Sequence, residues 1–267
     1  MKIRKILIAA GLACSVLGMG NLATANEWKE IRIGVEATYP PFEYRNAQGD
    51  MEGFDVDVAN AICGKLNAKC VWVEQSFDGL IPALQARKFD VIHSSMTATE
   101  ARAKVINFTD PLYAIPTQLI AKKGSGTLPT AESLKGKRLG VLQGTTQETY
   151  AKKAWGKGGV QIVSYQDQSQ TYADLRAGRL DAALLEKPNA IAGFLVTPEG
   201  RDFEFVGEVL SGDPILTNEI AMGLRKSDVK LKDAINKAIN ELVTEGTIAE
   251  IAGKYFQPGE IGLMQAK

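Results

Sequence analysis

The chain has 267 residues, and its 31 lysines and arginines balance 31 aspartates and glutamates. Because phosphate contacts need clustered Lys and Arg, this even balance argues against a nucleic-acid-binding protein. A single histidine leaves little scope for a metal site or a Ser–His–Asp triad.

The first 25 residues have the pattern of a secretory signal peptide. A positive start at 2–5 precedes an apolar run at 6–16, and small residues at 23–25 form a cleavage site. We therefore expect a signal peptide at 1–25 and an exported protein. An uncleaved membrane anchor is an alternative, although a span needs about 20 apolar residues. Lipidation at Cys14 is a second alternative.

Strand-like and helical patterns alternate in the next part of the chain. β-branched and apolar runs predict strands, and apolar residues at helical spacing predict a helix. The predicted elements are strands at 31–35, 70–73 and 89–95 and a helix at 55–66. Pro82 lies in a further helix and must be in its first turn, because proline lacks an N–H. Asp78 is the expected N-cap of that helix, with Phe77 just outside.

The same alternation continues with different residues. The predicted strands are 138–143, 161–165, 181–185 and 218–224, and the predicted helices are 145–155, 171–177, 188–196, a long one around 231–242 and a short one at 248–255. Two sets of strand–helix units indicate two α/β domains with largely parallel central sheets.

Two cysteines follow the signal segment, Cys63 and Cys70. An exported protein meets an oxidising compartment, so an isolated pair favours a disulfide. Closing so short a loop would contribute about 2–3 kcal/mol. Two buried thiols are the alternative.

Motifs of known enzymes are mostly missing. His93 ends a predicted strand and is expected to be packed, and no Gly-x-Ser-x-Gly elbow is present. The glycine-containing turn at 140–146 lacks the Gly-Lys-Ser/Thr ending of a phosphate loop. Its backbone N–H groups would still suit a small anion such as a carboxylate.

Three polar segments lie at the carboxyl ends of predicted strands, where open α/β sheets bind ligands. They are 36–42, 94–102 and Glu186. Arg102 can take a carboxylate in a two-pronged grip, and Glu186 can take an ammonium group. The three segments therefore suit a zwitterion, unless they are simply solvated loops.

Several motifs in a fixed order extend this pattern over essentially the whole chain after the signal segment. They are Tyr39-Pro-Pro-Phe42-Glu43, Gly53-Phe54-Asp55-Val56-Asp57, Ile81-Pro82-Ala83-Leu84, Ser94-Ser95-Met96-Thr97, Phe108-Thr109-Asp110 and the 140–148 segment Gly-Val-Leu-Gln-Gly-Thr-Thr-Gln-Glu. In these motifs the chain resembles the periplasmic solute-binding proteins of polar amino-acid ABC importers. The likeness is greatest to the lysine/arginine/ornithine- and histidine-binding group, whose disulfide the cysteine pair also matches.

The resemblance implies the type II periplasmic binding protein fold, an α/β fold of two lobes joined by two hinge crossings. Each lobe would have a central, mostly parallel sheet flanked by helices. Lobe one would comprise 26–114 plus 214–267, and lobe two 115–213. The ligand would sit in the cleft, and the lobes would close over it by hinge bending.

The resemblance also implies roles at the backbone end of an amino-acid ligand. Arg102 would grip the α-carboxylate, helped by Thr97 and Thr146. Glu186 would hold the α-ammonium group, with Ser95 assisting.

At the side-chain end, Tyr39 and Phe77 would sandwich the ligand. Glu36 and Ser94 would meet its far, polar tip. Close relatives usually have aspartate where this chain has Glu36 and Glu186, and glutamate reaches one methylene further. This difference bears on which ligand is preferred.

The implied function is that of a periplasmic receptor, without enzymatic activity, cofactor or metal. It would bind arginine, lysine, ornithine or histidine as a monomer and deliver it to an inner-membrane ABC permease and its ATPase. Three alternatives stay open: a receptor for a neutral amino acid such as glutamine, with Glu36 in solvent; a dehydratase of the same fold; and a subunit that presents ligand to a sensor.

Overall fold

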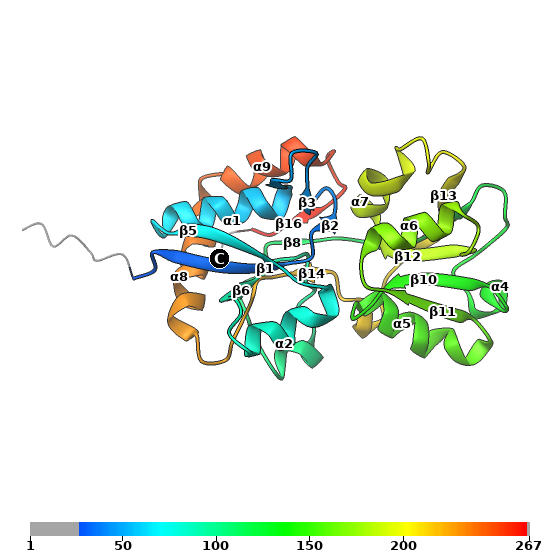
Figure 1. Ribbon diagram of the computed structural model, residues 1–267, viewed down its shortest axis with the longest axis horizontal. Helices are drawn as coiled ribbons and strands as arrows, with labels where there is room; N and C mark the ends of the chain where they lie inside the picture. Colours follow the sequence, from blue (N-terminus) through cyan, green and yellow to red (C-terminus); the bar gives the residue numbers. More distant parts are fainter. Residues whose placement is uncertain (1–26, 266–267) are drawn as a thin grey trace, which may run out of the picture.

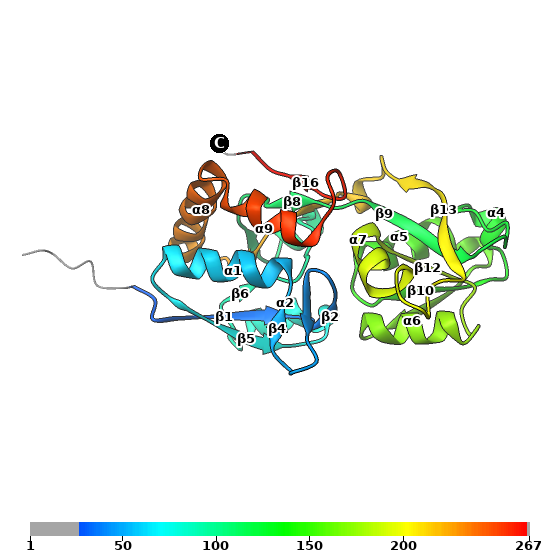
Figure 2. The same ribbon diagram turned by 90° about the horizontal axis from the view of Figure 1, so that it is seen from above.

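Two five-stranded sheets, side by side along the long axis of the molecule, carry the fold (Figures 1 and 2). The computed structural model describes residues 27–265, so the predicted signal peptide at 1–25 lies outside the described part of the chain. Within 27–265, no helix has the length and apolar character needed to cross a membrane. We call the half with the N-terminal sheet lobe one and the other half lobe two.

The sheet of lobe one has the strand order β5-β1-β6-β15-β7. Its members are β1 (Glu30–Val35), β5 (Lys69–Glu74), β6 (Val91–Ile92), β7 (Asn107–Phe108) and β15 (Gly223–Leu224). β1 pairs in parallel with β5 and β6, whereas β15 is antiparallel to both β6 and β7. Four strands therefore share one direction, and β15 runs against them.

The sheet of lobe two has the order β11-β10-β12-β9-β13. Its members are β9 (Thr117–Lys122), β10 (Arg138–Leu142), β11 (Gln161–Tyr165), β12 (Ala182–Glu186) and β13 (Phe203–Leu210). β10 is parallel to β11 and β12, and β9 is antiparallel to β12 and β13. Again one strand, β9, runs against four.

In both sheets the reversed strand is the first that the chain adds after crossing from the other lobe. β9 follows the passage out of lobe one, and β15 follows the return. The predicted two-lobed α/β fold with mostly parallel sheets is confirmed by this topology. The boundaries at 114/115 and 213/214 stay a prediction.

Helices cover both sheets. Their bounds are α1 (Phe54–Lys65), α2 (Leu80–Gln85), α3 (Glu100–Ala103), α4 (Ala131–Leu134), α5 (Thr146–Ala154), α6 (Gln168–Arg176), α7 (Lys187–Ala190), α8 (Val229–Thr244) and α9 (Thr247–Tyr255). In lobe one, α1, α8 and α9 pack against one another, and α2 lies against β1 and β6. The apolar stripe from Leu231 to Leu242 on α8 is buried, as its helical spacing predicts.

Six short strands within residues 27–265 complete lobe one, and of these the sequence patterns indicate only β14 (Glu219–Ile220), within the strand expected at 218–224. β2 (Thr38–Tyr39), β3 (Glu43–Arg45) and β4 (Met51–Glu52) form one small sheet, and β8 (Tyr113–Ala114), β14 (Glu219–Ile220) and β16 (Gly262–Leu263) form another. The first of these small sheets carries Tyr39 and Glu43, which line a cavity described below.

The predicted N-cap at Asp78 is wrong. Phe77–Gly79 forms a short 3₁₀ turn of its own, and the N-cap of α2 is Gly79. Pro82 still lies in the first turn of α2, where its missing N–H leaves no intrahelical bond unmade. The turn also buries Phe77 instead of leaving it outside the element.

Three other predicted elements are shorter or interrupted. The strand expected at 89–95 is reduced to Val91–Ile92. The strand expected at 218–224 is split into β14 and β15. The helix expected at 188–196 begins as α7 and continues as a π-helix over Ile191–Leu195.

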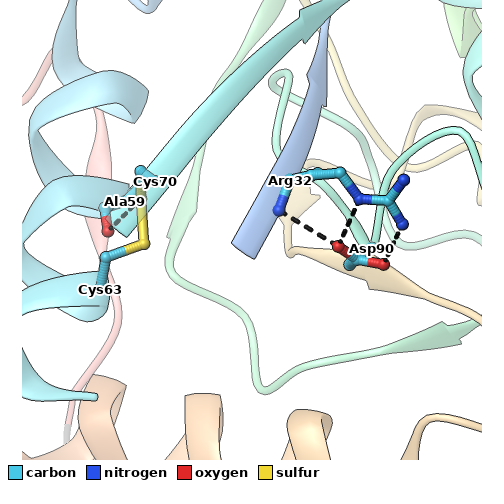
Figure 3. The surroundings of a disulfide bond; sticks show 5 residues. All are labelled: Arg32, Ala59, Cys63, Cys70 and Asp90. Carbon is cyan, nitrogen blue, oxygen red and sulfur yellow. Dashed lines mark hydrogen bonds and ion pairs between the residues drawn. A yellow bond between two sulfur atoms is a disulfide. The ribbon is translucent and has the colours of Figure 1, made fainter. Parts of the chain in front are cut away.

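The predicted disulfide is confirmed. Cys63 of α1 and Cys70 of β5 are joined, with their Cα atoms 5.9 Å apart (Figure 3). Figure 3 also shows Arg32, whose Nη2 and Nε donate to Asp90 at 2.8 and 3.0 Å and tie β1 to the segment before β6.

Replacing Cys63 and Cys70 together by alanine should lower the free energy of unfolding by about 2–3 kcal/mol, because the unfolded chain regains the entropy of the open loop. Urea unfolding followed by circular dichroism measures the change. A reductant should destabilise the unaltered protein and leave the double variant unchanged. Equal urea midpoints for the two proteins would contradict the expected stabilisation.

Candidate functional site

A small, partly enclosed cavity lies between the lobes. Lobe one and lobe two both contribute to its wall, which is formed by Glu36, Tyr39, Glu43, Phe77, Ser94, Ser95, Thr97, Arg102, Leu142, Thr145, Thr146, Gln147 and Glu186. The nine residues that the sequence singled out for ligand binding are all in this wall. Their role in binding stays a prediction.

Arg102 supplies the positive charge of the cavity. It belongs to the single-turn helix α3, whose N-cap is Thr99. Its Nη1 donates to the carbonyl of Thr97 at 2.8 Å and its Nη2 to the carbonyl of Gly144 in lobe two at 3.0 Å. The guanidinium carbon lies 5.3 Å from the centre of the Phe77 ring, within cation–π range.

No carboxylate in the described part of the chain pairs with Arg102 within ion-pair distance. Its hydrogen bonds go to neutral carbonyls, and desolvation lowers its pKa to about 10. A guanidinium held in this way is ready to accept an anion from the cavity.

Glu186 ends β12 and is buried. The Tyr39 hydroxyl donates to its Oε2 from lobe one, and the Gln147 side-chain amide donates to its Oε1 at 2.8 Å. The same amide nitrogen donates to Thr117 Oγ1 at 2.9 Å, at the start of β9. Burial raises the pKa of Glu186 to about 7. Both oxygens are thus oriented by neutral donors, and no cationic side chain of residues 27–265 forms an ion pair with this carboxyl group.

Glu36 follows the last residue of β1 and is only 3% exposed. Thr38 Oγ1 donates to its Oε1, while its buried Oε2 has no hydrogen-bond partner among residues 27–265. Burial raises the pKa of Glu36 to about 7. An unpartnered carboxylate oxygen in a buried wall is costly unless a donor meets it.

Glu43 is a cavity residue that the sequence reasoning missed. It lies on β3, and Ser94 and Ser95 donate to its two oxygens at 2.9 and 3.2 Å. Burial, then Asp55 and Glu36, raise its pKa well above the ordinary value. Glu43 directly follows the Tyr-Pro-Pro-Phe segment, which contains the predicted ligand-binding residue Tyr39. This position was the only feature of the sequence that could have indicated Glu43 as a cavity residue.

Lobe two meets the cavity with the first turn of α5. Thr145 is its N-cap and accepts a hydrogen bond from the Glu148 backbone N–H, while Glu148 accepts one from the Gly144 N–H at 2.7 Å. This capping arrangement directs Thr145, Thr146 and Gln147 toward the cavity. Gln147 adjoins the predicted Thr146, but no side-chain pattern in the sequence indicates that it would bond Glu186.

The lobes touch closely around the cavity. Asn189 Nδ2 donates to the Pro40 carbonyl at 2.7 Å, and the Gln168 N–H donates to Thr38 Oγ1 at 3.1 Å. Gly144 has a φ of +81°, and a Cβ there would lie 2.8 Å from Asp78 Cα. Only glycine fits this approach, so the lobes are in a closed arrangement.

His93 is packed behind the cavity instead of lining it. It is fully buried, with Nδ1 3.7 Å from Asp55 Oδ2, and burial lowers its pKa. Residues 27–265 contain no cluster of three His, Cys, Asp or Glu side chains that could hold a metal ion.

Comparison with known proteins shows which family this chain matches. Residues 31–258 match the model of the bacterial extracellular solute-binding proteins, family 3. The histidine-binding periplasmic protein of Salmonella typhimurium is 48% identical over 228 residues, which cover 85% of this chain and 88% of that protein.

The lysine/arginine/ornithine-binding periplasmic protein of Escherichia coli K12 is also 48% identical, over 226 residues, 85% of this chain and 87% of that protein. Among solved structures, an ancestral arginine-binding protein bound to arginine superposes with a TM-score of 0.80 at 35% identity. The superposition covers 86% of this chain and 99% of that one.

The buried glutamates predict that the ligand-free protein is more stable in mild acid than at neutral pH. The folded state keeps protons on Glu36 and Glu186 up to about pH 7, whereas these groups ordinarily ionise near 4.5. Their stabilisation is fully present below about pH 4.5 and is lost as the pH rises through about 7. For the two groups together the loss is on the order of a few kcal/mol.

Thermal unfolding of refolded, ligand-free protein at pH 5 and pH 8 measures this loss. Glu36→Gln and Glu186→Gln should each reduce the difference between the two midpoints, and Glu199→Gln, at an exposed position, should not. The same difference between the midpoints at pH 5 and pH 8 in all four proteins would show that these carboxyls do not cause the loss of stability.

Proposed function

The chain belongs to family 3 of the bacterial extracellular solute-binding proteins, and we propose that it is a receptor for a basic L-amino acid. Arginine, lysine, ornithine and histidine are the candidate ligands, bound between the lobes. Relatives named for histidine and for lysine, arginine and ornithine, each 48% identical to this chain, support this class of ligand.

The observation that carries the proposal is the charge of the cavity wall. Glu36, Glu43 and Glu186 face one cationic side chain, Arg102. An amino acid with a cationic side chain brings one negative and two positive groups, so it can pair with Arg102, Glu186 and Glu36. A neutral amino acid would leave Glu36 without a cation, so this buried carboxyl would either stay protonated or ionise at a large cost.

The backbone end of the ligand fits the Arg102 side of the cavity. The α-carboxylate would take a two-pronged bond from Arg102, with Thr97 and Thr146 beside it and the N-terminus of α5 adding its dipole. The α-ammonium group would meet Glu186, with Ser95 assisting. Tyr39 and Gln147 orient the carboxylate that receives it.

The side-chain end fits the Glu36 side. A cationic tip would bond the free Oε2 of Glu36, a charge-assisted bond of about 1.5–3 kcal/mol, with Ser94 nearby. The rings of Tyr39 and Phe77 would sandwich the stem of the ligand and add about 0.5–2 kcal/mol of cation–π attraction.

The proposed cellular role follows from this binding. The protein acts in the periplasm after removal of residues 1–25, as a monomer, and hands its amino acid to an inner-membrane ABC permease and its ATPase. Lobe one, 26–114 plus 214–267, and lobe two, 115–213, close by bending near the two crossings. The charged groups hold the ligand and carry out no reaction on it.

Thermal unfolding of refolded protein against the twenty common L-amino acids and ornithine tests the ligand class. A ligand that binds only the folded state raises the unfolding midpoint by mass action. Shifts confined to the basic amino acids support the proposal. A shift with glutamine alone would favour the neutral-ligand receptor, and no shift at all would contradict an amino-acid receptor.

Arg102→Ala should weaken every amino acid that binds, because it removes the partner of the α-carboxylate common to all. The dissociation constant should rise about 30-fold or more, the effect of breaking a buried charge pair worth about 2–5 kcal/mol. Isothermal titration calorimetry measures it. Arg179→Ala, an exposed arginine paired with Asp174, is the matched control. Near wild-type affinity in Arg102→Ala would refute the assigned site.

Glu36→Gln should discriminate between ligands. It removes the charge opposite a cationic tip, so arginine and lysine should bind about tenfold or more weakly, while glutamine should change little. Calorimetry with the three amino acids at one pH provides the comparison. An equal loss for all three would place Glu36 outside the side-chain subsite.

A further inference from the structure

Glu43 lies in the cavity wall without a role in the binding scheme above. It is 1% exposed, and it accepts from Ser94 Oγ at 2.9 Å and from Ser95 Oγ at 3.2 Å. The Glu43 carboxylate thus accepts hydrogen bonds from both serine hydroxyls that are expected to face the ligand.

Each serine hydroxyl has a single proton to donate and two lone pairs to accept with. Ser94 Oγ already accepts the Glu36 backbone N–H at 3.0 Å, so its proton goes to Glu43 and one lone pair is left. Its free capacity toward the cavity is therefore that of an acceptor.

Ser95 is in the same position for a different reason. Around its Oγ lie Glu43 Oε2, Asp55 Oδ2 at 3.5 Å and the Tyr113 hydroxyl at 3.3 Å. The Tyr113 hydroxyl donates its own proton to Asp55 Oδ1 at 2.6 Å. The proton of Ser95 thus has acceptors within the protein and none is left over for the cavity.

The backbone keeps Ser95 in this orientation. Its φ is +44°, a left-handed backbone conformation that residues other than glycine rarely adopt. Its N–H donates to Asp55 Oδ2 at 2.9 Å. Strain of this kind persists only where the surroundings hold it. The buried carboxylates of Glu43 and Asp55 are those surroundings.

We propose that Glu43 is a positioning residue that fixes Ser94 and Ser95 as hydrogen-bond acceptors, so that this part of the cavity selects N–H groups of a cationic ligand over carbonyl groups. The inference rests on the proposed function and deepens it. Specificity arises because a ligand carbonyl would meet oxygen lone pairs and find no donor.

The charges around Glu43 fit this role once a ligand is bound. Asp55 and Glu36 oppose its ionisation, and the neighbouring His93 is buried with a lowered pKa, so it contributes little positive charge. A cationic group in the cavity favours the ionised carboxylate, which accepts both hydroxyl protons.

The test compares arginine with citrulline, which has the same length and α-groups but an uncharged tip with a carbonyl. Glu43→Gln keeps the shape and puts an amide N–H₂ group beside the serines, which frees a hydroxyl proton for the cavity. The ratio of the citrulline to the arginine dissociation constant, from calorimetry, should fall at least tenfold. Glu74→Gln, a carboxylate of the same lobe paired with Arg45, should leave the ratio unchanged. A residue with a merely structural role would weaken both ligands alike, and an unchanged ratio in Glu43→Gln would overturn the inference.

A double-mutant cycle with Ser95→Ala tests whether Glu43 acts through the hydroxyl. The change in ratio caused by Glu43→Gln should be smaller in the Ser95→Ala background, and strictly additive changes would overturn the inference. Should Glu43→Gln fail to fold, Ser94→Ala and Ser95→Ala alone must each lower the ratio, or the inference fails. Wild-type protein without affinity for any basic amino acid would instead refute the proposed function.

Discussion

Buried charges without an opposite charge beside them are the constraint on which this site depends. Within the described chain Arg102 meets only carbonyls, Glu186 meets a hydroxyl and an amide, and one oxygen of Glu36 meets no donor. Polar neighbours within the described chain orient these groups, and none of them neutralises the charge. A molecule that supplies the missing charges can therefore bind strongly without any chemical step.

The fold brings these groups together through the ends of its strands. Glu36 follows β1, Ser94 and Ser95 lie just beyond β6, and Glu186 ends β12 in the other lobe. Because the carboxyl ends of parallel strands lie at one edge of a sheet, two such edges that face each other enclose one cavity. The close approach of Gly144 to Asp78 shows how little space is left when they do.

Much of this could be predicted from the sequence because the signals are local. The buried stripe of α8 and the strand at 161–165 follow from residue spacing. Some cavity residues follow from polar segments at strand ends, whereas Phe77 and Thr146 follow only from the family resemblance. The cap at Asp78 could not be predicted, since an added 3₁₀ turn moves the start of α2 to Gly79. Glu43 was missed because its partners lie about fifty residues away in sequence, so only the folded chain brings them together.

The reversed strands have a consequence for the order in which the chain can fold. β6 and β7 are not neighbours in the sheet of lobe one, because β15 sits between them and comes from residues 223–224, near the end of the chain. A chain that is synthesised amino end first cannot complete this sheet until residue 224 has emerged. Lobe two, which lies between the two crossings, has the last of its five strands at Phe203–Leu210, before β15. The sheet of lobe two can therefore be completed before the sheet of lobe one, and the cavity between the lobes forms after both.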